Sequence, residues 1–242
     1  MELGHQTRVL VTGASRGIGA AMADAFEARG CTVGRVSRSG ELAADVADRD
    51  SIARAIEGFG RVDVLVANAG IAHYLPFTEM PPDLIEELTR VNWLGTVYTV
   101  KAALPGMLER GRGHVVIVSS GAGIRSFPSA AVYGATKAAQ RGFGEALRHE
   151  LKGTGVGLTM VYPGQIRTSL HDHEKERMPD WYRLERGAAP EPLAEALVEA
   201  VEKDRREVFY PSNVRLLRIV HGVRPALADT LLRRIMHRSA AP

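Results

Sequence analysis

The sequence predicts an α/β protein with a parallel β-sheet, and three observations support this fold class. Short runs rich in β-branched residues alternate with longer helical stretches along the chain. A glycine-rich turn, TGASRGIG, follows the first apolar run and opens the first helix. The chain has 242 residues, of which 45% are hydrophobic, so it can bury one substantial core. We therefore expect a single domain over residues 1–242.

The alternation can be followed element by element. Strands are expected at residues 8–12, 32–36, 62–67, 114–120, 156–162 and 208–211. Helices are expected from the glycine turn to residue 29 and at about 50–59, 84–110, 130–152 and 192–203. Between Ser37 and Asp45 the chain has only RSGELAA, which leaves too little room for a helix.

Two segments lie outside this alternation. Residues 165–190 carry clustered charges and few periodic apolar positions, which is typical of a functional lid. The tail 211–242 contains two amphipathic pieces, and from Arg205 onward the chain has eight arginines against Glu207 and Asp229. We expect the tail to cover a pocket or to form a subunit contact. Peripheral attraction to an anionic membrane is less favoured, because the apolar stripe is short.

Composition and charge exclude several classes of protein. The single Cys31 excludes a disulfide framework and fits a reducing, cytoplasmic compartment. His171 and His173 have no third ligand nearby, so no metal is expected. No apolar run suits a signal peptide or a membrane span. The net charge is only +3, and no nucleic-acid-binding module accompanies the basic tail, so we expect no nucleic-acid partner.

The glycine turn predicts a dinucleotide site. Gly13, Gly17 and Gly19 permit a tight backbone path and the close approach of a pyrophosphate, which would meet free N–H groups at the helix N-terminus. NAD sites usually carry an acidic residue after the second strand, but this chain has Arg38 there and no carboxylate. Arg16 and Arg38 suit a 2′-phosphate. The charges therefore favour NADP over NAD.

The stretch YGATK places Tyr133 and Lys137 one helical turn apart. A tyrosine pKa of about 10 is too high for acid or base work near neutral pH, and a neighbouring ammonium should lower it. The same spacing also occurs by chance beside a solvated lysine. Ser119 and Ser120 end an expected strand, so either serine can converge with the tyrosine on a carbonyl oxygen.

Taken together, these blocks resemble the short-chain dehydrogenase/reductases. The motifs TGASRGIG, NAG at 68–70, VNWLG, SSGAG, YGATK and PGQIRT keep that family's order over about residues 8–170. The resemblance implies a Rossmann-like, doubly wound parallel sheet of about seven strands in three α/β/α layers, and a nicotinamide-dependent oxidoreductase. Two departures stand out: Ala67 replaces the first of two usual asparagines, and the link between the second and third strands is short.

The resemblance also implies roles for individual residues. Tyr133 would be the general acid/base, Lys137 would lower its pKa and hold the nicotinamide ribose, and Asn92 would support a water-mediated proton relay. Ser120 would bind the substrate oxygen, because the family's thirteen-residue separation from Tyr133 selects it over Ser119. The implied cofactor-binding residues are Gly13, Ser15, Arg16, Gly17, Ile18, Gly19, Arg38, Asp45, Val46, Asn68, Ala69, Gly70, Tyr133, Lys137, Pro163, Gly164, Ile166 and Thr168.

We therefore expect an NADP(H)-dependent oxidoreductase that interconverts a secondary alcohol and a ketone, or an alcohol and an aldehyde. Apolar and aromatic residues in the lid and tail favour a hydrophobic substrate. His73, Tyr74 and Phe77 follow the NAG turn and either line the substrate pocket or pack within the loop. The alternative is a non-catalytic dinucleotide sensor. Replacement of Tyr133 or Lys137 would have indicated it, but both residues are present. The resemblance further implies a homodimer or homotetramer.

Overall fold

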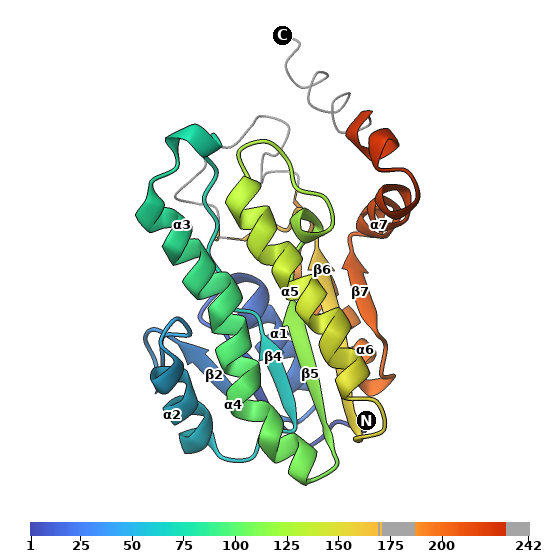
Figure 1. Ribbon diagram of the computed structural model, residues 1–242. Coiled ribbons are helices and arrows are strands. Elements are labelled where there is room, and N and C mark those ends of the chain that lie inside the picture. The colour runs from blue at the N-terminus through green and yellow to red at the C-terminus, as the bar shows by residue number, and fades with distance from the viewer. Residues whose placement is uncertain (169, 171–186, 231–242) are drawn as a thin grey trace.

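The computed structural model describes residues 1–168, 170 and 187–230 (Figure 1). Its centre is one parallel sheet of seven strands in the order β3-β2-β1-β4-β5-β6-β7. The strands are β1 (Arg8–Thr12), β2 (Thr32–Ser37), β3 (Leu42–Ala43), β4 (Val64–Ala67), β5 (Gly113–Val118), β6 (Val156–Pro163) and β7 (Glu207–Tyr210). The strand order reverses between β1 and β4, which confirms the predicted Rossmann-like, doubly wound sheet.

Helices cover both faces of the sheet and complete three layers. On one face, α1 (Gly17–Ala28) and α6 (Pro190–Glu202) share a buried apolar cluster with Val9 and Val11. On the other, α2 (Arg49–Phe59), α4 (Gly95–Glu109) and α5 (Ala131–Glu150) share a second cluster with Leu10. This division follows from the two-residue period of a strand, which points successive side chains to opposite faces. Strands β4 and β5 are buried throughout, as expected for the centre of a parallel sheet.

Two features differ from the expected element boundaries. The short link after β2 contains the edge strand β3, where Leu42 pairs with Val36 and Ala43 pairs with Ser37. Two residues are too few to show the alternation by which a strand is recognised in a sequence. The single helix expected at 84–110 consists of α3 (Pro82–Leu88), a π-helical turn η2 (Thr89–Leu94) and α4.

Short helical turns and the tail complete the described structure. The 3₁₀ turns are η1 (Phe77–Glu79) and η3 (Gly121–Gly123), and the tail contributes α7 (Asn213–Val223) and helical residues 225–230. Most of the expected lid and the tail from residue 231 lie outside the described residues. None of the described helices is long and apolar enough to cross a membrane.

The height of α5 above the sheet is set by a close contact with β6. A Cβ atom at Gly144 would lie only 2.2 Å from Met160 Sδ, so a larger residue there would force the buried Met160 side chain to move. The same helix carries Tyr133 and Lys137, so the contact fixes how far their side chains stand above the strands.

His114, at the start of β5, is a buried titratable group in the core. Its Nε2 lies 2.8 Å from Thr159 Oγ1, and that hydroxyl donates to the carbonyl oxygen of Arg205. Thr159 Oγ1 therefore accepts from His114 Nε2–H. Burial lowers the pKa of His114 to about 4, although the Asp204 carboxylate at 3.7 Å raises it in part.

We predict that this histidine makes the protein less stable as the pH falls. The unfolded chain takes up a proton near pH 6.5 and the folded chain only near pH 4, so unfolding is favoured progressively between these values. The free energy of unfolding should fall by about 2 kcal/mol from pH 7 to pH 5 through this group. Urea titrations at both pH values test this. His114→Gln should flatten the difference, and an equal difference in both proteins would contradict the prediction.

Candidate functional site

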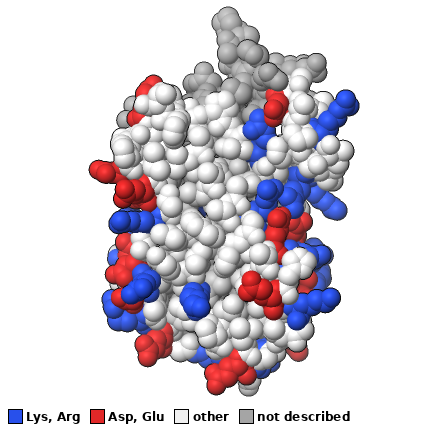
Figure 2. Space-filling model, in the orientation of Figure 1, with Lys and Arg blue, Asp and Glu red and all other residues white. Residues whose placement is uncertain are grey.

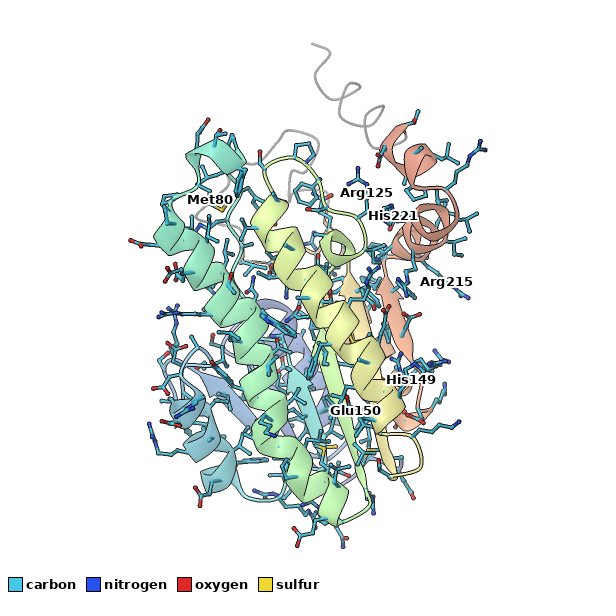
Figure 3. All side chains as sticks on the ribbon, viewed as in Figure 1. Met80, Arg125, His149, Glu150, Arg215 and His221 are labelled. Atoms are coloured by element: carbon cyan, nitrogen blue, oxygen red, sulfur yellow. The ribbon has the colours of Figure 1, made fainter. Side chains whose placement is uncertain are left out.

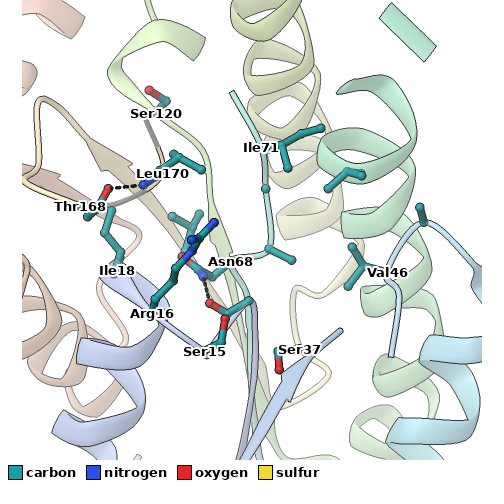
Figure 4. A pocket seen from close by; sticks show the side chains of 18 of the residues that line it. Ser15, Arg16, Ile18, Ser37, Val46, Asn68, Ile71, Ser120, Thr168 and Leu170 are labelled. Atoms are coloured by element: carbon teal, nitrogen blue, oxygen red, sulfur yellow. Dashed lines mark hydrogen bonds between the residues drawn. The ribbon is translucent and has the colours of Figure 1, made fainter. Parts of the chain in front are cut away.

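A pocket of about 580 Å³ opens at the carboxyl end of the sheet (Figure 4). Loops that follow β1, β2, β4, β5 and β6 meet there, together with the first turns of α1 and α5. Ligands of open α/β sheets bind at this end, beside the point where the strand order reverses. The topology therefore brings distant parts of the chain to one cavity.

Every residue expected to bind the cofactor lines this pocket. Of the catalytic candidates, Ser120, Tyr133 and Lys137 also line it. Asn92 does not, because it is fully buried behind the wall. The pocket thus joins the glycine turn to three of the four expected catalytic residues.

The glycine turn has the geometry that an anion site needs. Gly13 and Gly17 have φ values of +68° and +60°, which side chains rarely permit. A Cβ atom at Gly13 would lie 2.8 Å from Ala69 Cα, so the turn lies directly against the loop after β4. Helix α1 has no side-chain cap and no acidic residue in its first turn, which leaves its first backbone N–H groups for a phosphate.

Two arginines make one side of the pocket cationic. Arg16 and Arg38 both line it, both are exposed, and neither forms an ion pair with any described carboxylate. Arg35, in β2 and three residues before Arg38, is different, because it forms ion pairs with Asp24 and Glu27. Figure 4 shows Arg16 extending from the glycine turn over the pocket. The two guanidinium groups are therefore available to an anionic ligand.

The three polar side chains at the inner end of the pocket come from β5 and α5. Ser120 caps η3, and its Oγ accepts from the Ala122 N–H at 3.1 Å. Lys137 Nζ donates to the Val118 carbonyl oxygen at 3.1 Å and lies 5.9 Å from the centre of the Tyr133 ring. A glycine is needed at 123, because a Cβ atom there would lie 2.7 Å from the backbone of α5. This close packing brings Ser120 to the tyrosine.

Burial controls the protonation of the tyrosine and the lysine. Burial raises the pKa of Tyr133, and a hydrogen bond with Ser120 offsets part of that rise. Burial also lowers the pKa of Lys137 to about 8. The net pKa of the buried Tyr133 is therefore raised rather than lowered, and loss of hydration is the largest cause. Both side chains are shifted towards their neutral forms.

The Asn92 side chain ties the loop after β4 to α5. Its Oδ1 accepts from Ile71 N–H at 2.8 Å, and its Nδ2 donates to the Ile71 carbonyl oxygen at 2.9 Å and to Thr136 Oγ1 at 3.2 Å. The Thr136 hydroxyl in turn donates to the Tyr133 carbonyl oxygen at 2.7 Å. Asn92 therefore positions the backbone that carries the tyrosine.

Gln140 is a site-supporting residue that the sequence analysis missed. Its Nε2 donates to the Asn92 carbonyl oxygen at 2.8 Å and to Thr96 Oγ1 at 2.6 Å. The same carbonyl, in the π-helical turn, also accepts from Thr96 Oγ1 at 2.9 Å, so two side chains bond it. The sequence indicates Gln140 only through its position, because residues 133, 137 and 140 share one face of α5.

Other lining residues were also missed, and three candidates lie elsewhere. Helix α3 and the turn η2 add the charged residues Asp83, Glu86, Glu87 and Arg90 to the pocket lining. The apolar residues Ile71 and Leu170 also line the pocket. His73, Tyr74 and Phe77 are not among the described lining residues. Tyr74 is buried and packs edge-on against the Tyr133 ring at 5.9 Å, whereas Phe77 is 66% exposed.

The described residues contain no group of three histidine, cysteine, aspartate or glutamate side chains arranged to hold a metal ion. His171 and His173, considered above as metal ligands, lie outside the described residues.

Comparisons with known proteins agree with this geometry. A family profile described as "short chain dehydrogenase" matches residues 7–179. A dehydrogenase/reductase SDR family member 7B of Bos taurus is 32% identical over 83% of this chain and 72% of its own. A short chain dehydrogenase from Burkholderia cenocepacia in complex with NADP has a TM-score of 0.83 and 26% identity, covering 97% of this chain and 99% of its own. A 3-oxoacyl-[acyl-carrier protein] reductase with bound NAD from Brucella melitensis has a TM-score of 0.72 and 31% identity, with 86% and 92% covered.

We predict that Gln140→Leu destabilises the protein by about 0.5–1.5 kcal/mol, because the buried Asn92 carbonyl loses one donor and keeps the Thr96 hydroxyl. Urea unfolding measures the change. Gln6→Leu is the control, since Gln6 is exposed and its loss should cost less than about 0.5 kcal/mol. Equal stability of the two variants would show that the Gln140 amide does not support the turn.

Proposed function

This chain belongs to the short-chain dehydrogenase/reductase family, and on that premise we propose that it is an NADP(H)-dependent oxidoreductase. It would interconvert a secondary alcohol and a ketone, or an alcohol and an aldehyde. The observation that carries this proposal is the convergence of Ser120, Tyr133 and Lys137 on the pocket that the glycine turn also lines. Two hydroxyl donors beside a dinucleotide site suit a substrate oxygen on which charge changes during the reaction.

In the proposed mechanism, a bound nicotinamide supplies the hydride in reduction and accepts it in oxidation. Tyr133 donates its proton to the carbonyl oxygen as negative charge builds there, and Ser120 donates a hydrogen bond to the same atom. Burial favours the protonated tyrosine that reduction requires. Lys137 holds the nicotinamide ribose, and its ammonium stabilises the phenolate once it forms. We further propose that Asn92 supports a water-mediated proton relay.

The charges of the pocket support NADP over NAD as cofactor. Gly17, Ile18 and Gly19 stand at the uncapped start of α1, where a pyrophosphate is stabilised. Arg16 and Arg38 lack carboxylate partners among the described residues and suit a 2′-phosphate. Of the similar structures named above, one is in complex with NADP and another has bound NAD. The preference for NADP in this proposal therefore rests on the local charges.

A hydrophobic substrate is supported by the apolar residues near Ser120. Ile71 and Leu170 line the same pocket as Ser120 (Figure 4), and Tyr133 belongs to an apolar cluster that includes Tyr74 and Met80. We propose that the whole chain forms one oxidoreductase domain in which residues 165–190 act as a lid over this region. Ile166 and Thr168, at the start of that segment, line the cofactor side of the pocket.

We also propose that the chain forms a homodimer or homotetramer through α4 and α5. The outer surface over these two helices carries few charged side chains (Figure 2). Leu108 is 41% exposed on α4. A broad, weakly charged helical surface suits association with a second copy.

The second candidate, a non-catalytic dinucleotide sensor, would bind the cofactor without turnover. The presence of Tyr133 and Lys137 in the pocket favours an enzyme. The first experiment below separates the two functions.

Purified protein should oxidise NADPH with one or more members of a panel of hydrophobic ketones and aldehydes, measured as loss of absorbance of the reduced nicotinamide. Tyr133→Phe should lower kcat by at least about 100-fold, because the general acid is lost. Tyr98→Phe, a partly buried tyrosine on α4 outside the pocket, should leave turnover unchanged. Unchanged turnover in Tyr133→Phe would refute the mechanism, and NADPH binding without turnover on any member would favour the sensor.

Direct titration should show tighter binding of NADPH than of NADH. Arg38→Gln should weaken NADPH binding about tenfold or more and leave NADH nearly unaffected, because a charge-assisted hydrogen bond to the 2′-phosphate is removed. Arg54→Gln, an exposed arginine on α2 outside the pocket, is the matched control. Equal loss for both cofactors would place Arg38 away from the 2′-phosphate.

A further inference from the structure

Helix α7 carries an apolar face that points away from the protein. Leu216, Ile219 and Val223 are 62%, 55% and 81% exposed, and their spacing places them on one side of the helix. Val214 is buried, and the partly buried Leu217 packs against the main core. The helix therefore has two apolar sides, and only one of them is used to pack it on the domain.

The exposed apolar face is bordered by arginines. Arg215 and Arg224 are exposed, and neither pairs with any described carboxylate. Arg218 differs, because it bonds Glu145 at 3.0 Å on the inner side of the helix. Asp229 is the one acidic residue between 211 and 230, and Arg125 holds it in an ion pair. In Figure 3, Arg215 lies on the outer side of α7, and His221 lies nearer Arg125.

Helix α7 lies at the end of the molecule where the pocket opens, because it directly follows the carboxyl end of β7 (Figure 1). A Cβ atom at Gly164 would lie 2.7 Å from Val214, so the inner side of α7 packs on the loop that also lines the pocket. No described residue of α7 lines the pocket itself. The exposed face of α7 therefore does not cover the pocket, which was one of the roles expected for the tail.

We propose that the outer face of α7 docks reversibly on an anionic lipid surface. Apolar side chains in a row, flanked by unpaired arginines, are complementary to the boundary between acyl chains and phosphate headgroups. Arginine suits phosphate oxygens because its guanidinium can bind two of them at once. The described apolar row covers only α7 and Leu227, so the contact is reversible. Docking would hold the mouth of the pocket close to the lipid.

Sedimentation of the full chain with vesicles tests this proposal. The protein should pellet with vesicles of phosphatidylcholine and phosphatidylglycerol in equal parts, but not with phosphatidylcholine alone, and added salt should release it. Replacing the arginines, in Arg215→Gln/Arg224→Gln, should weaken partitioning about tenfold or more. Replacing the apolar row, in Leu216→Ser/Ile219→Ser/Val223→Ser, should abolish it.

Arg54→Gln/Arg112→Gln is the control matched to the arginine variant, because both residues are exposed, lie outside α7 and pair with no described carboxylate. It should pellet like the unaltered protein. Cofactor titration of every variant shows that the fold is kept and separates this proposal from the proposed function. Absence of the unaltered protein from anionic vesicle pellets would overturn the proposal, as would equal pelleting of the α7 variants. If the apolar substitutions instead lower the mass in solution while no variant pellets, a second copy covers this face and the proposal is wrong.

Discussion

The buried hydrogen bonds of Asn92 are the constraint on which the geometry of the pocket depends. The asparagine lies in a π-helical turn, its carbonyl oxygen accepts from Gln140 and Thr96, and its side chain bonds the backbone of Ile71. A buried polar group without a partner costs about 1–3 kcal/mol, so these bonds favour one arrangement of the turn, the β4 loop and α5. Because Tyr133 and Lys137 are on α5, their positions follow from this arrangement.

The same burial that fixes these side chains also changes their acidity. Burial shifts the Tyr133 phenol and the Lys137 ammonium towards their neutral forms, and for the phenol this is opposite to the effect inferred from the spacing alone. An anionic partner arriving in the pocket would shift Lys137 back towards its ammonium form. The protonation state of the site is thus coupled to what the pocket contains, rather than fixed by the four-residue spacing.

Much of the fold follows from local sequence, whereas the interactions that complete the site do not. The glycine turn is predictable because positive φ values at Gly13 and Gly17 and the following helix belong to one short stretch. Strand β3 is not predictable, because two residues are too few to show the alternation of buried and exposed side chains that is typical of a strand. The bond between Gln140 and Asn92 joins residues 48 positions apart, so no local pattern announces it. Likewise, the direction of the Tyr133 pKa depends on burial, which only the packed structure reveals.

The shortness of β3 has a consequence for how the protein behaves at high concentration. An edge strand of two residues exposes few backbone groups with which the strand of another molecule can pair. At the opposite edge, β7 has four residues and leads directly to α7, which packs beside it. The long apolar strands β5 and β6 are enclosed between these edges. The sheet is therefore protected from strand-to-strand aggregation by the length of its outermost members, although its central strands are strongly hydrophobic.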